Sequence, residues 1–370
     1  MLSRILSGDF PRSRVLTAVL IVVVLGLALA PFVFPGARAL NVAAKICVFI
    51  VLVASFDLLL GYTGIVSFAH TMFFGIGAYG VAVAITRMGP SWAAVAAGVG
   101  VALVLSFALS LVIGLFSLRV KAMFYAMITL AVAVAFQTLA SQLSDLTGGE
   151  DGLSFKVPEL LTPSFSLSET PFLGVSLNGK LISYYLLFAA TVLLFLVMLR
   201  IVNSPFGRVL QAIRENEFRA EALGYRTVAY RTASNVLSAS FATLAGALLA
   251  LWLRYNGPDT SLSFEIMIDI LLIVVIGGMG TLYGAVVGSA IFIIAQNYLQ
   301  DLMKLASNAT SGVPVLRDLL HPDRWLLWLG LLFIISVYRF PIGIVGKLRV
   351  NAWIKARAKA MAAATAKGVS

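Results

Sequence analysis

Residues 265–299 read EIMIDILLIVVIGGMGTLYGAVVGSAIFIIAQNYL, an apolar run that the glycine cluster GGMG divides at residues 277–280. A helix that spans a bilayer needs about 20 apolar residues. The run is therefore long enough for one tilted helix or for two short crossings broken near the glycines. The choice between these alternatives sets the number of spans and the side on which the following segments lie.

Comparable apolar runs occur along most of the chain. The 370 residues are 60% hydrophobic and only 12% charged, and a soluble protein of this length would need more charge at its surface. We therefore expect an all-α polytopic membrane protein, with residues 1–370 forming one membrane domain. The expected spans are residues 15–34, 40–60, 63–86, 91–116, 121–141, 182–202, 232–255, 265–278, 281–299 and 325–343. The first span follows a basic segment, which leaves a cleaved signal peptide as the alternative to the retained helix that its length favours.

The distribution of charge predicts the orientation of these spans. The net charge is +11, and because the basic residues gather in short loops and tails, they favour orientation in a lipid bilayer over nucleic-acid binding. The N-terminal segment, residues 203–231 and the tail 347–370 are basic, so we expect them in the cytoplasm. Residues 142–181 are mainly acidic and suit a periplasmic loop. With both termini inside, the number of crossings is even, so residues 265–299 must cross twice and the total is ten.

Glycines within the quoted stretch favour close helix packing. Gly280, Gly284 and Gly288 follow one another at four-residue spacing, which places them on one face of a helix. Small residues let helix backbones approach closely in a membrane. We therefore expect these three glycines to form a helix-packing groove.

A second glycine-rich stretch, GYTGIVSFAHTMFFGIGAYG at residues 61–80, also carries a histidine. Its glycines predict either a helix packed tightly at several points or one interrupted near the middle of the bilayer. Ser67, His70 and Thr71 fall at helical spacing and, with Gly75 and Gly77, are candidates to line a polar pathway. The alternative is that the polar side chains satisfy one another or a neighbouring carbonyl.

Other polar residues in apolar runs have simpler interpretations. Asp57 and Asp269 fall near the ends of expected spans, which favours positions at the membrane interface. In an ion-coupled secondary transporter they and His70 would be the candidate coupling groups. Cys47, the single cysteine, is expected to be a small packing residue.

Residues 203–227, NSPFGRVLQAIRENEFRAEALGYRT, predict an amphipathic cytoplasmic helix. Ser204 and Pro205 have the character of a helix start, and Gly224 that of a helix end. The helix could rest on the lipid surface or dock a soluble partner. A lipid-binding helix usually has Lys and Arg on its polar face, so the carboxylates Glu217 and Glu221 favour docking.

Six segments in order resemble the bacterial branched-chain amino-acid ABC transporter permease family. They are GYTGIVSFAHTMFFGIGAYG, LTGGEDGL, SPFGRVLQAIRENEFRAEALGYRTVAYR, FATLAGALLAL, GGMGTLYGAVVGSAIF and LGLLFIISVYRFPIGIVG, spread between about residues 40 and 346. The resemblance implies a permease subunit in the bacterial inner membrane that imports leucine-type amino acids by alternating access. Relatives that carry urea or other small polar solutes leave the substrate open.

The resemblance also implies partners and a coupling site. A periplasmic binding protein would deliver the substrate near residues 147–153, a second, related permease would complete the path, and cytoplasmic ATPases would drive it. The residues expected to couple to the ATPase are Arg214, Glu217, Glu221, Ala222 and Gly224. The general importer signature has two alanines after the glutamate and a more distant glycine, whereas here Ala222, Leu223 and Gly224 follow Glu221.

The chain offers no chemistry of its own to drive transport. It has no GxxxxGK[ST] phosphate loop, and the nearest match, at Gly346–Lys347, lacks the first glycine and the hydroxyl. Neither a metal-ligand set nor a nucleophile–base pair is evident. We therefore expect no enzymatic activity and no cofactor in this chain, with ATP acting through partner subunits. A secondary transporter or a channel remains as the competing class.

Overall fold

The computed structural model describes residues 13–34, 36–116, 122–165, 178–309 and 319–350. In this part of the chain, ten helical segments are long and apolar enough to cross a membrane, as the sequence predicts. Their helices are α2 (Arg14–Val33), α3 (Ala37–Thr63), α4 (His70–Met88), α5 (Trp92–Phe116), α6 (Ala122–Gln142), α8 (Gly179–Val202), α11 (Thr227–Leu253), α13 (Phe264–Gly277), α14 (Leu282–Ala309) and α16 (Trp325–Arg339).

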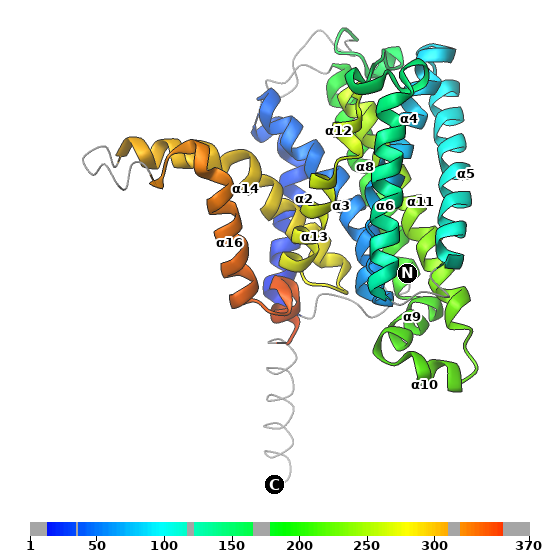
Figure 1. The fold of residues 1–370 in the computed structure, drawn as a ribbon. Helices are drawn as coiled ribbons and strands as arrows, with labels where there is room; N and C mark the ends of the chain where they lie inside the picture. Colours follow the sequence, from blue (N-terminus) through cyan, green and yellow to red (C-terminus); the bar gives the residue numbers. More distant parts are fainter. Residues whose placement is uncertain (1–12, 35, 117–121, 166–177, 310–318, 351–370) are drawn as a thin grey trace, which may run out of the picture.

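Shorter elements mark the two ends of the bundle. At one end, at the bottom of Figure 1, lie α9 (Pro205–Glu215) and α10 (Glu217–Ala222). The opposite end carries α7 (Ser144–Thr147), η1 (Gly149–Asp151), β1 (Leu153–Ser154), η2 (Glu159–Leu161), β2 (Tyr255–Asn256) and α12 (Pro258–Ser261), and η3 (Pro322–Arg324) precedes α16. We call these ends the α9–α10 side and the β1–β2 side. The basic segment 203–231 and the described part of the acidic segment 142–181 thus lie on opposite sides, whereas residues 1–12 and 351–370 of the basic ends lie outside the described residues.

Helix α3 forms the centre of the bundle. It is buried along most of its length and packs against α8, α11 and α14. By contrast, α2, α5 and α16 expose many apolar side chains, among them Val22, Val104 and Leu326. An apolar outer surface around a buried helix is what a bilayer-embedded bundle requires, because lipid covers the outside.

Polar side chains of α11 bind it to its neighbours. Ser238 donates a hydrogen bond of 2.6 Å to the carbonyl of Ser55 in α3, and Asn235 donates one of 2.7 Å to the carbonyl of Ser110 in α5. Hydrogen bonds between helices stabilise helix association in lipid, where the hydrophobic effect contributes little to it. These contacts therefore fix α11 between α3 and α5.

The expected span at residues 63–86 begins later than predicted. Helix α3 ends at Thr63, Gly64 adopts φ +76° as its C-cap, and residues 64–69 are not helical. Helix α4 starts at His70, whose Nε2 lies 2.8 Å from the hydroxyl of Ser55, two turns back along α3. Of the two interpretations of residues 61–80, the structure therefore shows the interrupted helix, with α4 starting inside the bundle.

The stretch 265–299 crosses twice, as expected, and breaks at the glycine cluster. The two crossings are unequal: Pro258–Gly277, which includes α12 and α13, has 20 residues, and Leu282–Asn308 in α14 has 27, so the prediction of two short crossings is wrong for α14. Gly280 is also not on the predicted helix face, because it lies in the turn between the helices with φ +77°. A Cβ built at Gly288 would lie 2.6 Å from the carbonyl oxygen of Ile273, so close packing of α14 on α13 does require glycine here.

Candidate functional site

The described residues enclose a cavity of about 680 Å³ in the half of the bundle nearest the β1–β2 side. It lies between α3, α11, the segment α12–α13 and α14, with Phe74 of α4 at its inner end. Its polar lining comes from Arg38, Asn41, Lys45, Asp259, Thr260, Ser263, Glu265, Asp269, Gln296 and Asn297, and its apolar lining from Val42, Phe49, Phe74, Leu249, Trp252, Leu253 and Ile266. The volume falls within the range of small-molecule sites.

A chain of hydrogen bonds crosses the inner wall of this cavity. The ammonium of Lys45 in α3 donates to Oε1 of Gln296 in α14 at 3.0 Å, and Nε2 of Gln296 donates to a carboxylate oxygen of Asp269 in α13 at 3.2 Å. The Lys45 ammonium also lies 5.5 Å from the centre of the Phe49 ring. One amide therefore stands between a cation and an anion that come from different helices.

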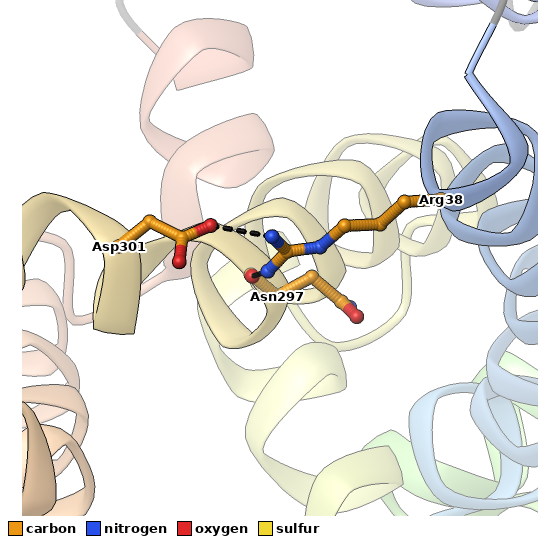
Figure 2. Close-up of polar contacts among 3 residues, drawn as sticks. All are labelled: Arg38, Asn297 and Asp301. Atoms are coloured by element: carbon orange, nitrogen blue, oxygen red, sulfur yellow. Dashed lines mark hydrogen bonds and ion pairs between the residues drawn. The ribbon is translucent and has the colours of Figure 1, made fainter.

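An ion pair lies at the outer rim of the cavity. Figure 2 shows the guanidinium of Arg38 reaching from the start of α3 to α14, where it bonds Asp301 at 2.6 Å and the carbonyl of Asn297 at 2.5 Å. The same guanidinium lies 5.2 Å from the centre of the Tyr298 ring. Arg38 thus pairs with Asp301 while both side chains stay about half exposed, and it joins α3 to α14 at the mouth of the cavity.

The three polar residues expected to line a pathway are buried elsewhere. Ser67 lies in the non-helical segment before α4, where its hydroxyl accepts a hydrogen bond from the amide of Ala69 at 3.4 Å. His70 packs edge-on against Phe56 in addition to its contact with Ser55. Thr71 is buried beside it. None of the three lines the cavity, so their role in a pathway stays a prediction.

Gly75 and Gly77 lie at helix contacts rather than on the cavity wall. A Cβ at Gly77 would overlap the backbone carbonyl of Thr243 in α11, and one at Gly246 would overlap the carbonyl of Phe74 in α4. A Cβ at Gly75 would instead meet the side chain of Leu262. The glycines therefore allow α4 and α11 to touch backbone to backbone, next to Phe74, which lines the cavity.

The predicted docking helix is two helices. Asn216 interrupts it with an extended backbone (φ −160°) and caps α10, accepting a hydrogen bond from the amide of Arg219 at 2.9 Å. The predicted start at Ser204 and Pro205 is observed, and Gly224 adopts φ +90° just after α10. The short polar side chain of Asn216 competes with the helix for backbone hydrogen bonds, which explains the break.

The two carboxylates expected to couple to a partner bind helix α11 of this chain. Glu217 forms an ion pair of 2.5 Å with Arg231, and Glu221 accepts a hydrogen bond of 2.7 Å from Thr227. Ala222 and Gly224 are exposed. The most exposed apolar side chains of this region are Phe218 (84%) and Leu223 (72%). The sequence marks Leu223 as apolar but gives neither residue a role, although large apolar residues in a charged segment indicate an interaction surface.

Arg214 connects α9 to the centre of the bundle. Its guanidinium donates a hydrogen bond to the carbonyl of Gly61 near the end of α3. One turn back on α3, the carboxylate of Asp57 accepts a hydrogen bond of 2.8 Å from the amide of Gly280. Asp57 is 2% exposed, so it faces the interior of the bundle, and its expected depth near the membrane interface stays a prediction. Helices α3 and α9 and the turn before α14 thus meet in one polar cluster.

Comparison with known proteins gives a family and several relatives. A family model described as the permease component of branched-chain amino acid transport systems matches residues 38–337. The high-affinity branched-chain amino acid transport system permease protein LivM of Salmonella typhimurium is 26% identical over 301 residues, covering 78% of this chain and 70% of the relative. BraD of Pseudomonas aeruginosa, a permease protein of a system with the same description, is 25% identical and covers 80% and 91%. LivH of Salmonella typhimurium is 24% identical over 65% of this chain and 78% of the relative. No solved structure gives a significant match.

Proposed function

Since the chain belongs to the branched-chain amino acid transport permease family, we propose that it is the membrane-spanning subunit of an ATP-driven importer of branched-chain amino acids. A permease component is a transport protein and not an enzyme, and the chain is a multi-pass membrane protein. In this proposal a binding protein delivers the substrate on the β1–β2 side, and ATPase subunits act on the α9–α10 side. The orientation follows from the basic α9–α10 segment and corresponds to a bacterial inner membrane.

The observation that carries the proposal is the form of α9 and α10. Phe218 and Leu223 project from a charged segment outside the bundle, while Arg214 reaches inward to Gly61. Exposed apolar side chains rimmed by polar residues mark protein interaction sites. A self-sufficient carrier would have no use for such a surface joined to its central helix. We assign the surface of Phe218 and Leu223 to the ATPase.

In this proposal, different roles fall to the five residues that the sequence predicts to couple to the ATPase. Glu217 and Glu221 hold α10 to α11, and Gly224 supplies the left-handed turn that ends it. Ala222 adds exposed surface beside Leu223. Arg214 transmits the movement of α9 to α3. ATP binding and hydrolysis then shift the bundle between states open to either side, and this chain itself holds no nucleotide.

The second permease is expected to be a related chain. LivM and LivH of Salmonella typhimurium are both named as permease proteins of a branched-chain amino acid transport system, and both are similar to this chain. The greater identity is to the LivM protein. We therefore propose pairing with a chain of the LivH kind, with each permease contributing its own α9–α10 surface for one ATPase.

The transport proposal is tested by uptake of labelled leucine in bacteria that lack this gene, with and without its restoration. Restored uptake that survives an uncoupler while ATP is maintained supports the proposal. Uptake abolished by the uncoupler under those conditions would indicate an ion-coupled carrier instead. Absence of restored leucine uptake, with urea uptake restored, would move the substrate to a small polar solute.

The docking surface has its own test. We expect Phe218→Ala combined with Leu223→Ala to lower the amount of ATPase that co-purifies with the permease by at least tenfold. Leu160 is an exposed apolar residue on the β1–β2 side. Leu160→Ala is therefore the matched control, and this variant should retain the ATPase. Equal retention by all variants would contradict the assignment of this surface.

A further inference from the structure

The inner wall of the cavity presents two opposite charges that are not paired with each other. Lys45 and Asp269 are bridged by the amide of Gln296, and within the described residues neither forms a direct ion pair. Ionisable groups within membrane-spanning segments are costly and are usually kept for function. Bridged in this way, each charge keeps hydrogen-bonding capacity beyond its bond to Gln296, at the wall of the cavity.

Arg38, the other cation that lines the cavity, already has two partners and is less available to a ligand than Lys45. Arg38 is bound to Asp301 and to the carbonyl of Asn297 at the rim. The acidic side chains Asp259 and Glu265 also lie near the rim and are exposed. A ligand that enters past the rim would therefore meet Lys45 as its cation and Asp269 as its nearest anion, with Glu265 one turn away on α13 adding to the negative potential there.

The surfaces next to these charges are apolar. Phe49 and Phe74 are almost fully buried at the inner end, and Trp252 and Ile266 continue the wall. A site with a few convergent polar groups and an apolar lining fixes the orientation of a small ligand by the polar groups and binds its hydrocarbon part by the lining. The ligand that this wall fits carries both charges at one end and hydrocarbon at the other.

We propose that this cavity binds an α-amino acid, with its carboxylate on Lys45, its ammonium on Asp269 and its side chain against Phe49 and Phe74. This inference rests on the proposed function and extends it, because it gives the permease its own substrate site in addition to that of a binding protein. Gln296 is a positioning residue that holds the two charges apart in the empty site. The pair of charges selects α-amino acids over ligands that carry only one charge, and the apolar wall favours amino acids with aliphatic side chains.

The test uses the whole transporter, purified with its partner permease and ATPases but without the binding protein. Leucine at millimolar concentration should raise the thermal unfolding temperature of the complex. Two leucine analogues, 4-methylpentanoate without the ammonium and 3-methylbutylamine without the carboxylate, should each require at least tenfold higher concentration for the same shift. Because this comparison uses the unaltered protein, it does not depend on the folding of any variant.

Variants locate the site. Lys45→Met and Asp269→Asn should each raise the leucine concentration that gives half of the thermal shift by at least tenfold. Lys45→Arg and Asp269→Glu keep the charge, so they should raise this concentration less. Lys156→Met and Asp145→Asn, at exposed residues on the β1–β2 side outside the cavity, are the matched controls and should bind as the unaltered complex does.

Three outcomes would overturn the inference. They are no leucine-dependent shift, a shift that either analogue reproduces equally well, or a shift that survives both Lys45→Met and Asp269→Asn. If cells that contain the unaltered transporter and its binding protein nevertheless import leucine with ATP, only this inference fails. If those cells import no leucine, the proposed function fails as well, so the uptake assay separates the two cases.

Discussion

The backbone contact between α4 and α11 predicts that alanine at position 77 destabilises the bundle. A Cβ at Gly77 would overlap the carbonyl group of Thr243, and real Cβ atoms keep at least 3.0 Å from other heavy atoms. The obstacle is backbone and not a flexible side chain, so no rotamer change relieves it. The two helices must therefore move apart.

The expected cost follows from this separation. Overpacking of this kind costs ~1–3 kcal/mol, and a gap of about 0.5–1 Å forfeits roughly a quarter to a half of each neighbouring dispersion contact. The shift also strains the hydrogen bond of 2.6 Å from Thr243 to Ser106 of α5, which is worth about 1 kcal/mol. Replacing glycine by alanine in a helix stabilises the helix by about 1 kcal/mol, which offsets part of this loss. We expect a net loss of about 2 kcal/mol in the free energy of unfolding.

The assay compares Gly77→Ala with a matched substitution on α5. Gly100 has nothing within 4 Å of a built Cβ, so Gly100→Ala should be neutral or stabilise by up to about 1 kcal/mol. Both variants are purified in the same detergent, and their unfolding is followed by circular dichroism against temperature and against added denaturing detergent. Equal stability of the two variants would refute the argument that the α4–α11 contact requires glycine.

Other predictions concern polar contacts between helices, each measured by the same unfolding assay. Asp57→Ala leaves the amide of Gly280 without its carboxylate and should cost about 1.5–3 kcal/mol; a variant as stable as the unaltered protein would argue against a role in holding the turn before α14. Tyr184→Phe removes the hydrogen bond of 2.5 Å from α8 to the carbonyl of Leu27 in α2 and should cost about 1 kcal/mol, whereas no measurable change would mean that lipid or water replaces it. Glu217→Gln weakens a partly exposed ion pair with Arg231 and should cost less than about 1 kcal/mol; a loss several times larger would show that α10 depends on this pair.

The number of spans and their main breaks could be predicted from the sequence. Apolar run length and the requirement for an even number of crossings give ten spans, which the structure confirms. Glycine marks both breaks, at Gly64 and at the turn that contains Gly280. The length of α14 could not be predicted, because polar residues such as Gln296 and Asp301 look like a helix end. They continue the helix because they contact α13 and α3 across the bundle.

The candidate site was harder to predict than the fold. The sequence favours a position at the membrane interface for Asp269, with a coupling role in a secondary transporter as the alternative, and it indicates no role for Lys45 or Arg38. The partner of Lys45 is 251 residues away in the sequence, so no local spacing indicates the pair. His70 is a candidate by sequence because it is ionisable within an apolar run, yet its contact with Ser55 lies between α3 and α4. One sequence shows which polar residues lie in a span, but only the packing shows which of them share a cavity.

Helix α3 has a consequence for the energetics of transport. It runs unbroken from Ala37 to Thr63 and carries Lys45 at the cavity and Asp57 at the cluster with Arg214, about 18 Å apart at a rise of 1.5 Å per residue. Two ligands that bias the position of one rigid element are thermodynamically linked, and the linkage is reciprocal. If ATPase docking shifts α3, the factor by which it changes amino-acid affinity must equal the factor by which the amino acid changes ATPase affinity. Measuring either of these two factors therefore gives the other.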